Sequence, residues 1–290
     1  MNKFYQGIYN GVEEIKTMGN NTELKFTDLL AALGEAGKRL SEIEASEGAA
    51  GNLSICVREP LELPDSFPLV SDMELPVPVP GLEGATFIVT GSGRRLREIA
   101  NSPESNLGCL VVQEGGSTAR MYTSPQRRFE RVTSEFNSHL AVHYDQMRES
   151  GGDFHAIVHA QPLHLTYLSQ IPRYQDEKYF NTHLLRWQPE AIINFSEGIG
   201  CIPFNVPGSP ELMSANVESL RAHRMVIWAK HGVMSRSNTS IMRAVDLVEY
   251  AEAAARYEYL NLNVGEIGEG LSTDEIHAIC NYWNIHQNIF

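Results

Sequence analysis

Three apolar segments of this chain each run into a glycine, and this pattern constrains the fold more than any other feature. They read "TFIVTGSG" at 86–93, "LGCLVVQEGGSTARMY" at 107–122 and "MVIWAKHGVMSR" at 225–236. Apolar runs bounded by glycine are typical of strands joined by tight turns. Such strands lie antiparallel, because a parallel connection needs a crossover of a dozen or more residues.

Segments with helical spacing alternate with these strands. We therefore expect a mixed, largely antiparallel sheet with helices on both faces. Residues 60–84 carry little periodicity and predict an irregular segment with short edge strands. No linker divides the chain, so we expect a helical extension over 1–24 and one domain over 25–290. The expected helices cover 1–22, 27–45 (capped by Thr27-Asp28), 134–147, 163–168, 176–186, 209–222, 241–262 and 272–285, and further strands cover 52–59, 154–160, 190–195 ("EAIINF") and 198–204.

Composition excludes several classes of function. The 290 residues carry a net charge of −13, and the densest basic cluster is short. Such a chain is a poor candidate for binding nucleic acid or an anionic membrane. The four cysteines lack CxxC spacing, which fits a reducing compartment. With no signal peptide and no apolar run of membrane-spanning length, we expect a cytoplasmic protein.

Two glycine-rich segments are candidates for holding an anion. "VTGSGRR" follows a strand, so its backbone amides and the Ser92 hydroxyl could cradle a phosphate. In "AAGNLS", Asn52 could donate its amide to a phosphate. Both segments have an ordinary alternative, since glycine also serves plain turns and asparagine helix ends.

The segment "RVTSEFNSHLAVH" places Glu135 near the start of a helix. Thr133 or Ser134 could cap that helix, and its N-terminus would favour anions. In one interpretation Glu135 only complements the helix dipole in the first turn. In the other it faces a cleft and acts as an acid or base.

Histidines at two strand ends suggest a metal site. His159 ends the apolar strand "FHAIVHA", and His231 follows "MVIWAK". Gln161 lies two residues after His159, on the same face of an extended chain. His155 shares that face but lies about 13 Å from His159 at roughly 3.3 Å per residue, too far for one ion. A hydrogen-bonded histidine with no metal is the plainer alternative, and His139 and His143 are interpreted as helix-face residues.

Taken in order, these motifs resemble the class II aldolase/adducin family over roughly residues 25–262. No single motif is specific, but their order and spacing are. The matching segments are "GNLS" at 51–54, "FIVTGSG" at 87–93, "NLG" at 106–108, "TSE" at 133–135, "VHA" at 158–160, "VPG" at 206–208 and Trp228 followed by "HGV" at 231–233.

The resemblance implies a three-layer α/β/α fold around a mixed, mostly antiparallel central sheet, and a cyclic homotetramer. It implies one divalent metal per subunit, usually zinc, with manganese or magnesium as alternatives. It also implies cleavage of a small ketose 1-phosphate to dihydroxyacetone phosphate and a short aldehyde such as lactaldehyde. The roles it assigns are acid/base for Glu135, metal ligand for His159 and His231, and phosphate contact for Asn52, Ser92, Gly93, Thr133 and Ser134.

Two positions depart from the family pattern. The family's His-x-His is His159-Ala160-Gln161 here, and Ala49 replaces a residue on the phosphate side. Gln161 could coordinate through its amide oxygen, a neutral hard ligand better suited to manganese or magnesium than to zinc. The alternatives are an epimerase that uses the same retro-aldol chemistry, and a non-catalytic adducin-like protein. Because Glu135, His159 and His231 are all present, we expect an enzyme.

Overall fold

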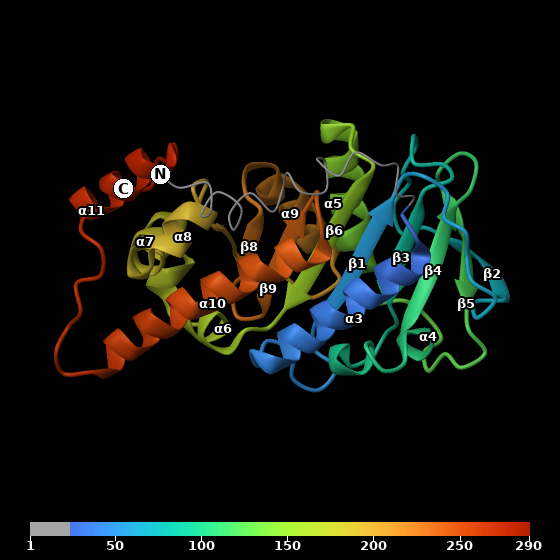
Figure 1. Ribbon diagram of the computed structural model, residues 1–290, viewed down its shortest axis with the longest axis horizontal. Helices are drawn as coiled ribbons and strands as arrows, with labels where there is room; N and C mark the ends of the chain where they lie inside the picture. Colours follow the sequence, from blue (N-terminus) through green and yellow to red (C-terminus); the bar gives the residue numbers. More distant parts are fainter. Residues whose placement is uncertain (1–23) are drawn as a thin grey trace, which may run out of the picture.

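A computed structural model describes residues 24–290 of the chain and contains one nine-stranded sheet at its centre (Figure 1). The strand order is β2-β5-β4-β3-β1-β6-β9-β8-β7. Every neighbouring pair is antiparallel except β7 and β8, which are parallel. The expected mixed, mostly antiparallel sheet is therefore confirmed. The strands are β1 Asn52–Val57, β2 Leu69–Glu74, β3 Thr86–Thr90, β4 Leu107–Val112, β5 Thr118–Thr123, β6 Phe154–Ala160, β7 Gly200–Ile202, β8 Met225–Trp228 and β9 Gly232–Ser237.

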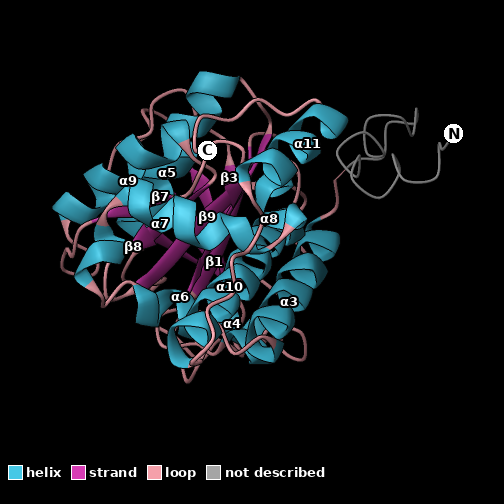
Figure 2. Cartoon of the chain, turned by 90° about the vertical axis from the view of Figure 1, so that its left-hand side faces the viewer, coloured by secondary structure: helices cyan, strands magenta, loops and turns pink. Residues whose placement is uncertain are grey.

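Helices cover both faces of the sheet, which gives three layers (Figure 2). On one face lie α3 (Phe26–Glu42), α6 (Leu163–Leu168) and the long α10 (Ile241–Asn263), and on the other lie α5 (Phe136–Ser150) and α9 (Pro210–Ala222). The remaining helices are α4 Pro103–Asn106, α7 Glu177–Leu184, α8 Pro189–Asn194 and α11 Thr273–Trp283, with short 3-10 turns at Leu96–Glu98, Pro172–Gln175 and Leu185–Trp187.

The central strands are buried on both faces. Every residue of β1 and β3 is buried, whereas the edge strand β2 is almost wholly exposed. This explains why β3 reads as a nearly continuous apolar run while β2 follows an irregular proline-rich stretch. Polar residues within β1 and β6 therefore need partners inside the protein.

One expected strand is wrong. The segment "EAIINF" lies in helix α8, which begins at Pro189. A short apolar run does not distinguish a buried strand from a helical turn by periodicity. Proline at the first helical position and the burial of Ala191, Ile192 and Asn194 are consistent with the helix.

Both expected helix caps also need correction. Helix α3 begins at Phe26, one residue before Thr27, and the Phe26 ring is buried against Phe67. Asp28 lies in its first turn instead of capping it. Helix α5 begins at Phe136 with Glu135 itself as the N-cap residue, and the Glu135 side chain makes no capping hydrogen bond.

The helix expected within residues 1–22 lies outside the described residues, so the division at residue 24 stays a prediction. Within residues 24–290, no helix is both long and apolar enough to cross a membrane.

Candidate active site

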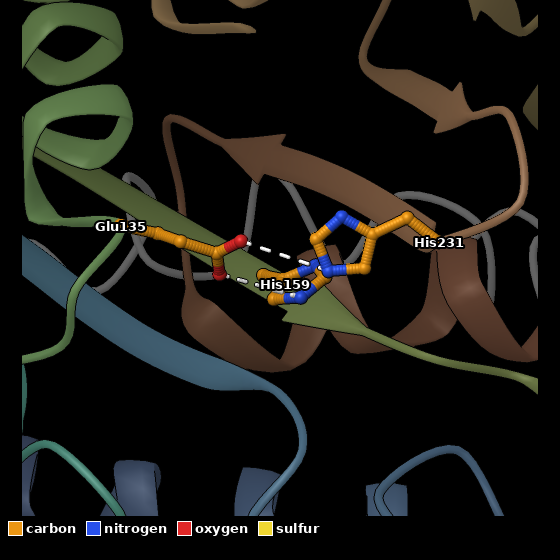
Figure 3. A group of neighbouring side chains, drawn as sticks. All are labelled: Glu135, His159 and His231. Atoms are coloured by element: carbon orange, nitrogen blue, oxygen red, sulfur yellow. Dashed lines mark ion pairs between the residues drawn. The ribbon is translucent and has the colours of Figure 1, made fainter. Parts of the chain in front are cut away.

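Three side chains from separate elements converge at one end of the central strands (Figure 3). Glu135 precedes α5, His159 lies near the end of β6, and His231 lies in the tight turn between β8 and β9. That turn requires Lys230 at φ 67°, a left-handed conformation. The antiparallel pairing of β6 with β9 brings His159 and the turn together although they are 72 residues apart.

The carboxylate of Glu135 faces both imidazoles, whose ring centroids are 5.0 Å apart (Figure 3). Its Oε2 is 3.4 Å from His159 Nε2, and its Oε1 is 3.7 Å from His231 Nε2. One ligand atom from each residue lies within 4.8 Å of the others. Among residues 24–290, this is the one His/Cys/Asp/Glu group whose ligand atoms converge in this way.

The donor atoms fit a divalent metal. His159 Nδ1 lies 2.8 Å from the carbonyl oxygen of Val233, so Nδ1 donates there and the Nε2 lone pair faces the site. A backbone carbonyl that fixes the second ring nitrogen is a common feature of metal-binding histidines. Glu135 Oε1 and His231 Nδ1 are buried without a hydrogen-bond partner. Two imidazoles with an unpartnered carboxylate oxygen suit zinc or another first-row divalent ion.

Burial and mutual charge set the protonation of the group. Burial alone would raise the pKa of Glu135, but His159, the hydrogen bond from Asn52 and His231 together lower that pKa below its ordinary value. Burial, with His159 nearby, lowers the pKa of His231 to about 4. The carboxylate is therefore ionised and His231 is neutral near pH 7, the states that metal binding requires.

The residues expected to hold phosphate line a cavity of about 220 Å³ that includes this group. The loop after β3 contributes Gly91 to Arg94, and the segment before α5 contributes Thr133 and Ser134. Gln161 also lines this cavity. The complete lining is Ala49, Ala50, Gly51, Asn52, Gly91, Ser92, Gly93, Arg94, Thr133, Ser134, Glu135, His159, Gln161, Pro207 and His231.

Two glycines shape this wall. Gly93 has φ 70°, with open space where a Cβ would lie. Gly51 has φ 80°, and a Cβ there would lie 2.8 Å from the His159 carbonyl oxygen. The backbone of 51 therefore packs directly against the strand that carries His159, an approach that only glycine permits.

Sequence reasoning missed several features of this site. Arg94 is the cation in the wall, held by Glu98 at 2.7 Å and Asn106 at 2.8 Å. His139 and His143 lie on a face of helix α5 as expected, but that face is fully buried and both side chains are hydrogen-bonded within it. Their signal was present in the sequence, because Glu135, His139 and His143 recur every four residues and so share one face of a helix.

The sequence of the chain matches a known family. Residues 31–259 match the family described as class II aldolase and adducin N-terminal domain. This chain belongs to that family. The rhamnulose-1-phosphate aldolase of Klebsiella pneumoniae is 28% identical over 209 residues, which span 72% of this chain and 74% of the relative. The enzyme of that name from Yersinia pestis is 30% identical, over 71% of this chain and 74% of the relative. These relatives support an aldolase lyase.

Solved structures of the family share the fold. A sugar-phosphate aldolase from Thermotoga maritima aligns with a TM-score of 0.69 and 27% identity, over 84% of this chain and 99% of that one. An L-fuculose 1-phosphate aldolase aligns with a TM-score of 0.54 and 20% identity, over 91% of this chain and all of that one, and supports the fold alone. The expected three-layer class II aldolase architecture is confirmed.

Proposed function

We propose that this protein is a metal-dependent aldolase that cleaves a ketose 1-phosphate of the rhamnulose 1-phosphate type. The products would be dihydroxyacetone phosphate and a short aldehyde such as lactaldehyde. The convergence of Glu135, His159 and His231 in a polar cavity lined by a glycine loop is the observation that carries the proposal. The curated relatives named rhamnulose-1-phosphate aldolase support the choice of substrate class.

His159 and His231 would hold the ion through their Nε2 atoms, with Gln161 as a candidate third ligand. A bound divalent metal would act as a Lewis acid on the substrate oxygens, which is commonly worth several kcal/mol. The family resemblance and the two imidazole ligands favour zinc as the ion, with manganese or magnesium as alternatives.

Glu135 is the proposed acid/base. Retro-aldol cleavage takes the proton from a hydroxyl group, breaks the adjacent carbon–carbon bond and releases the aldehyde. The electron pair of that bond stays on the other fragment as an enediolate, which then needs a proton at carbon. An ionised carboxylate beside the ligands can carry protons for these steps. Its unpartnered Oε1 is the atom that is free to do so.

The phosphate would lie against the loop of Ser92 and Gly93 and the segment of Thr133 and Ser134. Backbone amides and hydroxyls in such a cradle donate to phosphate oxygens, and Arg94 adds positive charge at the wall. Phosphate binding remote from the breaking bond would orient the substrate. The family resemblance also supports a cyclic homotetramer, which stays a prediction.

Elemental analysis of the purified protein, followed by assay of dihydroxyacetone phosphate release from rhamnulose 1-phosphate with added Zn, Mn or Mg, tests this proposal. We expect turnover with at least one ion, and a loss of about 10²–10⁴-fold in Glu135→Gln. Glu130→Gln, an exposed carboxylate outside the cavity lining, should leave turnover unchanged. Protein that binds no metal and is inert with every ion would refute the aldolase. Accumulation of an epimeric sugar phosphate without dihydroxyacetone phosphate would point to an epimerase instead.

A further inference from the structure

A buried row of polar side chains leads from Glu135 into the layer between α5 and the sheet. Glu135 is the N-cap residue of α5, and His139 and His143 follow it at four-residue intervals along one face of the helix. Asn52 and Ser54 are two residues apart on β1 and so face the same side of the sheet. All five side chains are at least nine-tenths buried. Because burial removes most of their contact with water, their polar atoms need partners among their neighbours.

The contacts form one continuous chain. Asn52 Nδ2 donates to Glu135 Oε2 at 2.8 Å, and Asn52 Oδ1 contacts His139 Nε2. Ser54 Oγ lies 2.6 Å from His139 Nδ1 and 2.7 Å from His143 Nε2. His143 Nδ1 then contacts the Nδ1 atom of the next histidine at 2.7 Å. This is His155 on β6, whose Nε2 is buried without a partner and ends the chain.

The hydrogen bond that Asn52 Nδ2 donates to Glu135 Oε2 fixes the direction of the other bonds in the chain. A carboxylate only accepts, so the Asn52 amide must turn its NH₂ group toward it, and Oδ1 then requires a donor. His139 Nε2 therefore carries the hydrogen. If His139 is neutral, its Nδ1 accepts the Ser54 hydroxyl hydrogen, and Ser54 Oγ must accept from His143 Nε2. His143 Nδ1 is then an acceptor and takes the hydrogen of His155 Nδ1.

Burial supports three neutral histidines. It lowers the pKa of His139 to about 3, that of His155 to about 3, and that of His143 well below its ordinary value. The unpartnered Nε2 of His155 agrees with hydrogen bonds that all donate toward Glu135. In that direction the row of hydrogen bonds ends in an acceptor atom, His155 Nε2, to which nothing donates. The reverse direction would turn Asn52 Oδ1 toward the carboxylate, so that two acceptors would face each other.

We propose that Ser54, His139, His143 and His155 are positioning residues that lock the Asn52 amide with its NH₂ group on Glu135 Oε2. This orientation of the Asn52 amide keeps Glu135 Oε2 as a hydrogen-bond acceptor. It leaves Glu135 Oε1 as the carboxylate atom available to substrate. None of the four histidine and serine side chains lines the cavity, so they act only through Asn52. The consequence for catalysis rests on the proposed acid/base role of Glu135, whereas the hydrogen-bond direction does not.

Nitrogen NMR of the full-length protein labelled with ¹⁵N-histidine tests the direction at pH 7, with single-site variants used to assign the resonances. We expect His139 and His143 as Nε2–H tautomers and His155 as the Nδ1–H tautomer. A cationic His139, or an Nδ1–H tautomer at His139, would overturn the proposal. This measurement needs no turnover, so it stands even if the proposed reaction fails.

Two substitutions at His139 test the function of the lock. Glutamine at position 139 places its amide near the position of His139 Nε2 and can still donate to Asn52. Asparagine at that position places its amide near the position of Nδ1 and cannot reach Asn52. We expect His139→Asn to lower kcat about tenfold or more with little change in KM, as for a lost bond to a charged group. His139→Gln should stay within a few fold of the parent.

Equal losses of kcat in the two variants would indicate a purely structural role for His139 and overturn the proposal. A rise in KM in His139→Asn with unchanged kcat would also overturn it. The latter result would mean that Asn52 serves the phosphate, the role expected from sequence. If neither variant folds, the tautomers of the parent protein still decide the direction. A parent protein that is inert with every ion would contradict the proposed function and leave the tautomer result intact.

Discussion

At the scale of single residues, Gln161 distinguishes this chain from the His-x-His pattern of its family. It lies two residues after His159 and lines the same cavity. If its amide oxygen occupies a ligand position, Gln161→His should raise zinc affinity, because imidazole nitrogen suits zinc better than a neutral oxygen. Since even outer-shell changes alter affinity about 10–100-fold, we expect a gain of at least about tenfold. Competition with a chromophoric chelator measures it, and Gln170→His in the neighbouring cavity serves as control. Equal affinities in Gln161→His and the parent would mean that the side chain at 161 points elsewhere.

Gly51 tests the close approach of the phosphate-side loop to β6. Gly51→Ala adds a Cβ 2.8 Å from the His159 carbonyl oxygen at φ 80°, whereas Gly48→Ala adds one at φ 57° with nothing within 4 Å. Both changes carry the left-handed strain of about 1–2 kcal/mol. Only Gly51→Ala also displaces backbone, which we expect to cost a further 1–3 kcal/mol or so and to lower metal affinity. Urea unfolding of the two variants measures the difference, and equal losses of unfolding free energy would show that the clash relaxes freely.

The sequence predicted the residues that converge at the site better than it predicted their hydrogen-bond partners. Glu135, His159 and His231 were all candidates, because strand ends and a helix start indicate where polar side chains can meet. The link from Asn52 to His139 could not be predicted, since it depends on the register between β1 and β6 and on how α5 crosses them. Register is a property of packed strands, which periodicity alone does not give.

At the scale of elements, helix α9 follows the Pro207-Gly208 segment beside the cavity, and its N-cap is Ser209. The Ser209 hydroxyl accepts from the Leu212 N–H at 3.1 Å. Ser209→Ala should cost about 1 kcal/mol of unfolding free energy, because it leaves one first-turn donor without its cap. Ser214→Ala, an exposed position on the same helix, should cost less than about 0.5 kcal/mol. Thermal or urea unfolding compares them, and equal effects would mean that water replaces the cap.

The same scale explains where sequence-based prediction of elements worked. Strands bounded by glycine and helices of ten or more residues were placed within a few residues, because tight turns and long periodic faces are local signals. The helix at 189–194 was mistaken for a strand because six residues are too few to show a period. The start of α5 was misplaced because Glu135 is directed toward His159 instead of capping the helix.

At the scale of the whole molecule, the buried histidines make folding sensitive to mild acid. An unfolded histidine titrates near pH 6.5, whereas burial lowers the pKa of both His139 and His155 to about 3. Below pH 6.5 the unfolded chain therefore binds protons that the folded chain does not, and the unfolding free energy falls as pH falls. At pH 5 the loss is about 2 kcal/mol for each of these two residues, relative to pH 7 or above. His143 and His231 act in the same direction.

Urea unfolding at pH 7 and pH 5, in the presence of a chelator so that metal release does not contribute, measures this loss. His155→Asn removes one titrating group while an amide remains near the Nδ1 position to donate to His143. The loss between pH 7 and pH 5 should therefore shrink by about 2 kcal/mol in this variant. His277→Asn, at an exposed position on α11, should leave the loss as in the parent. A loss of the same size in His155→Asn and the parent would mean that His155 is already charged in the folded protein, which its burial and the lack of any partner for its Nε2 oppose.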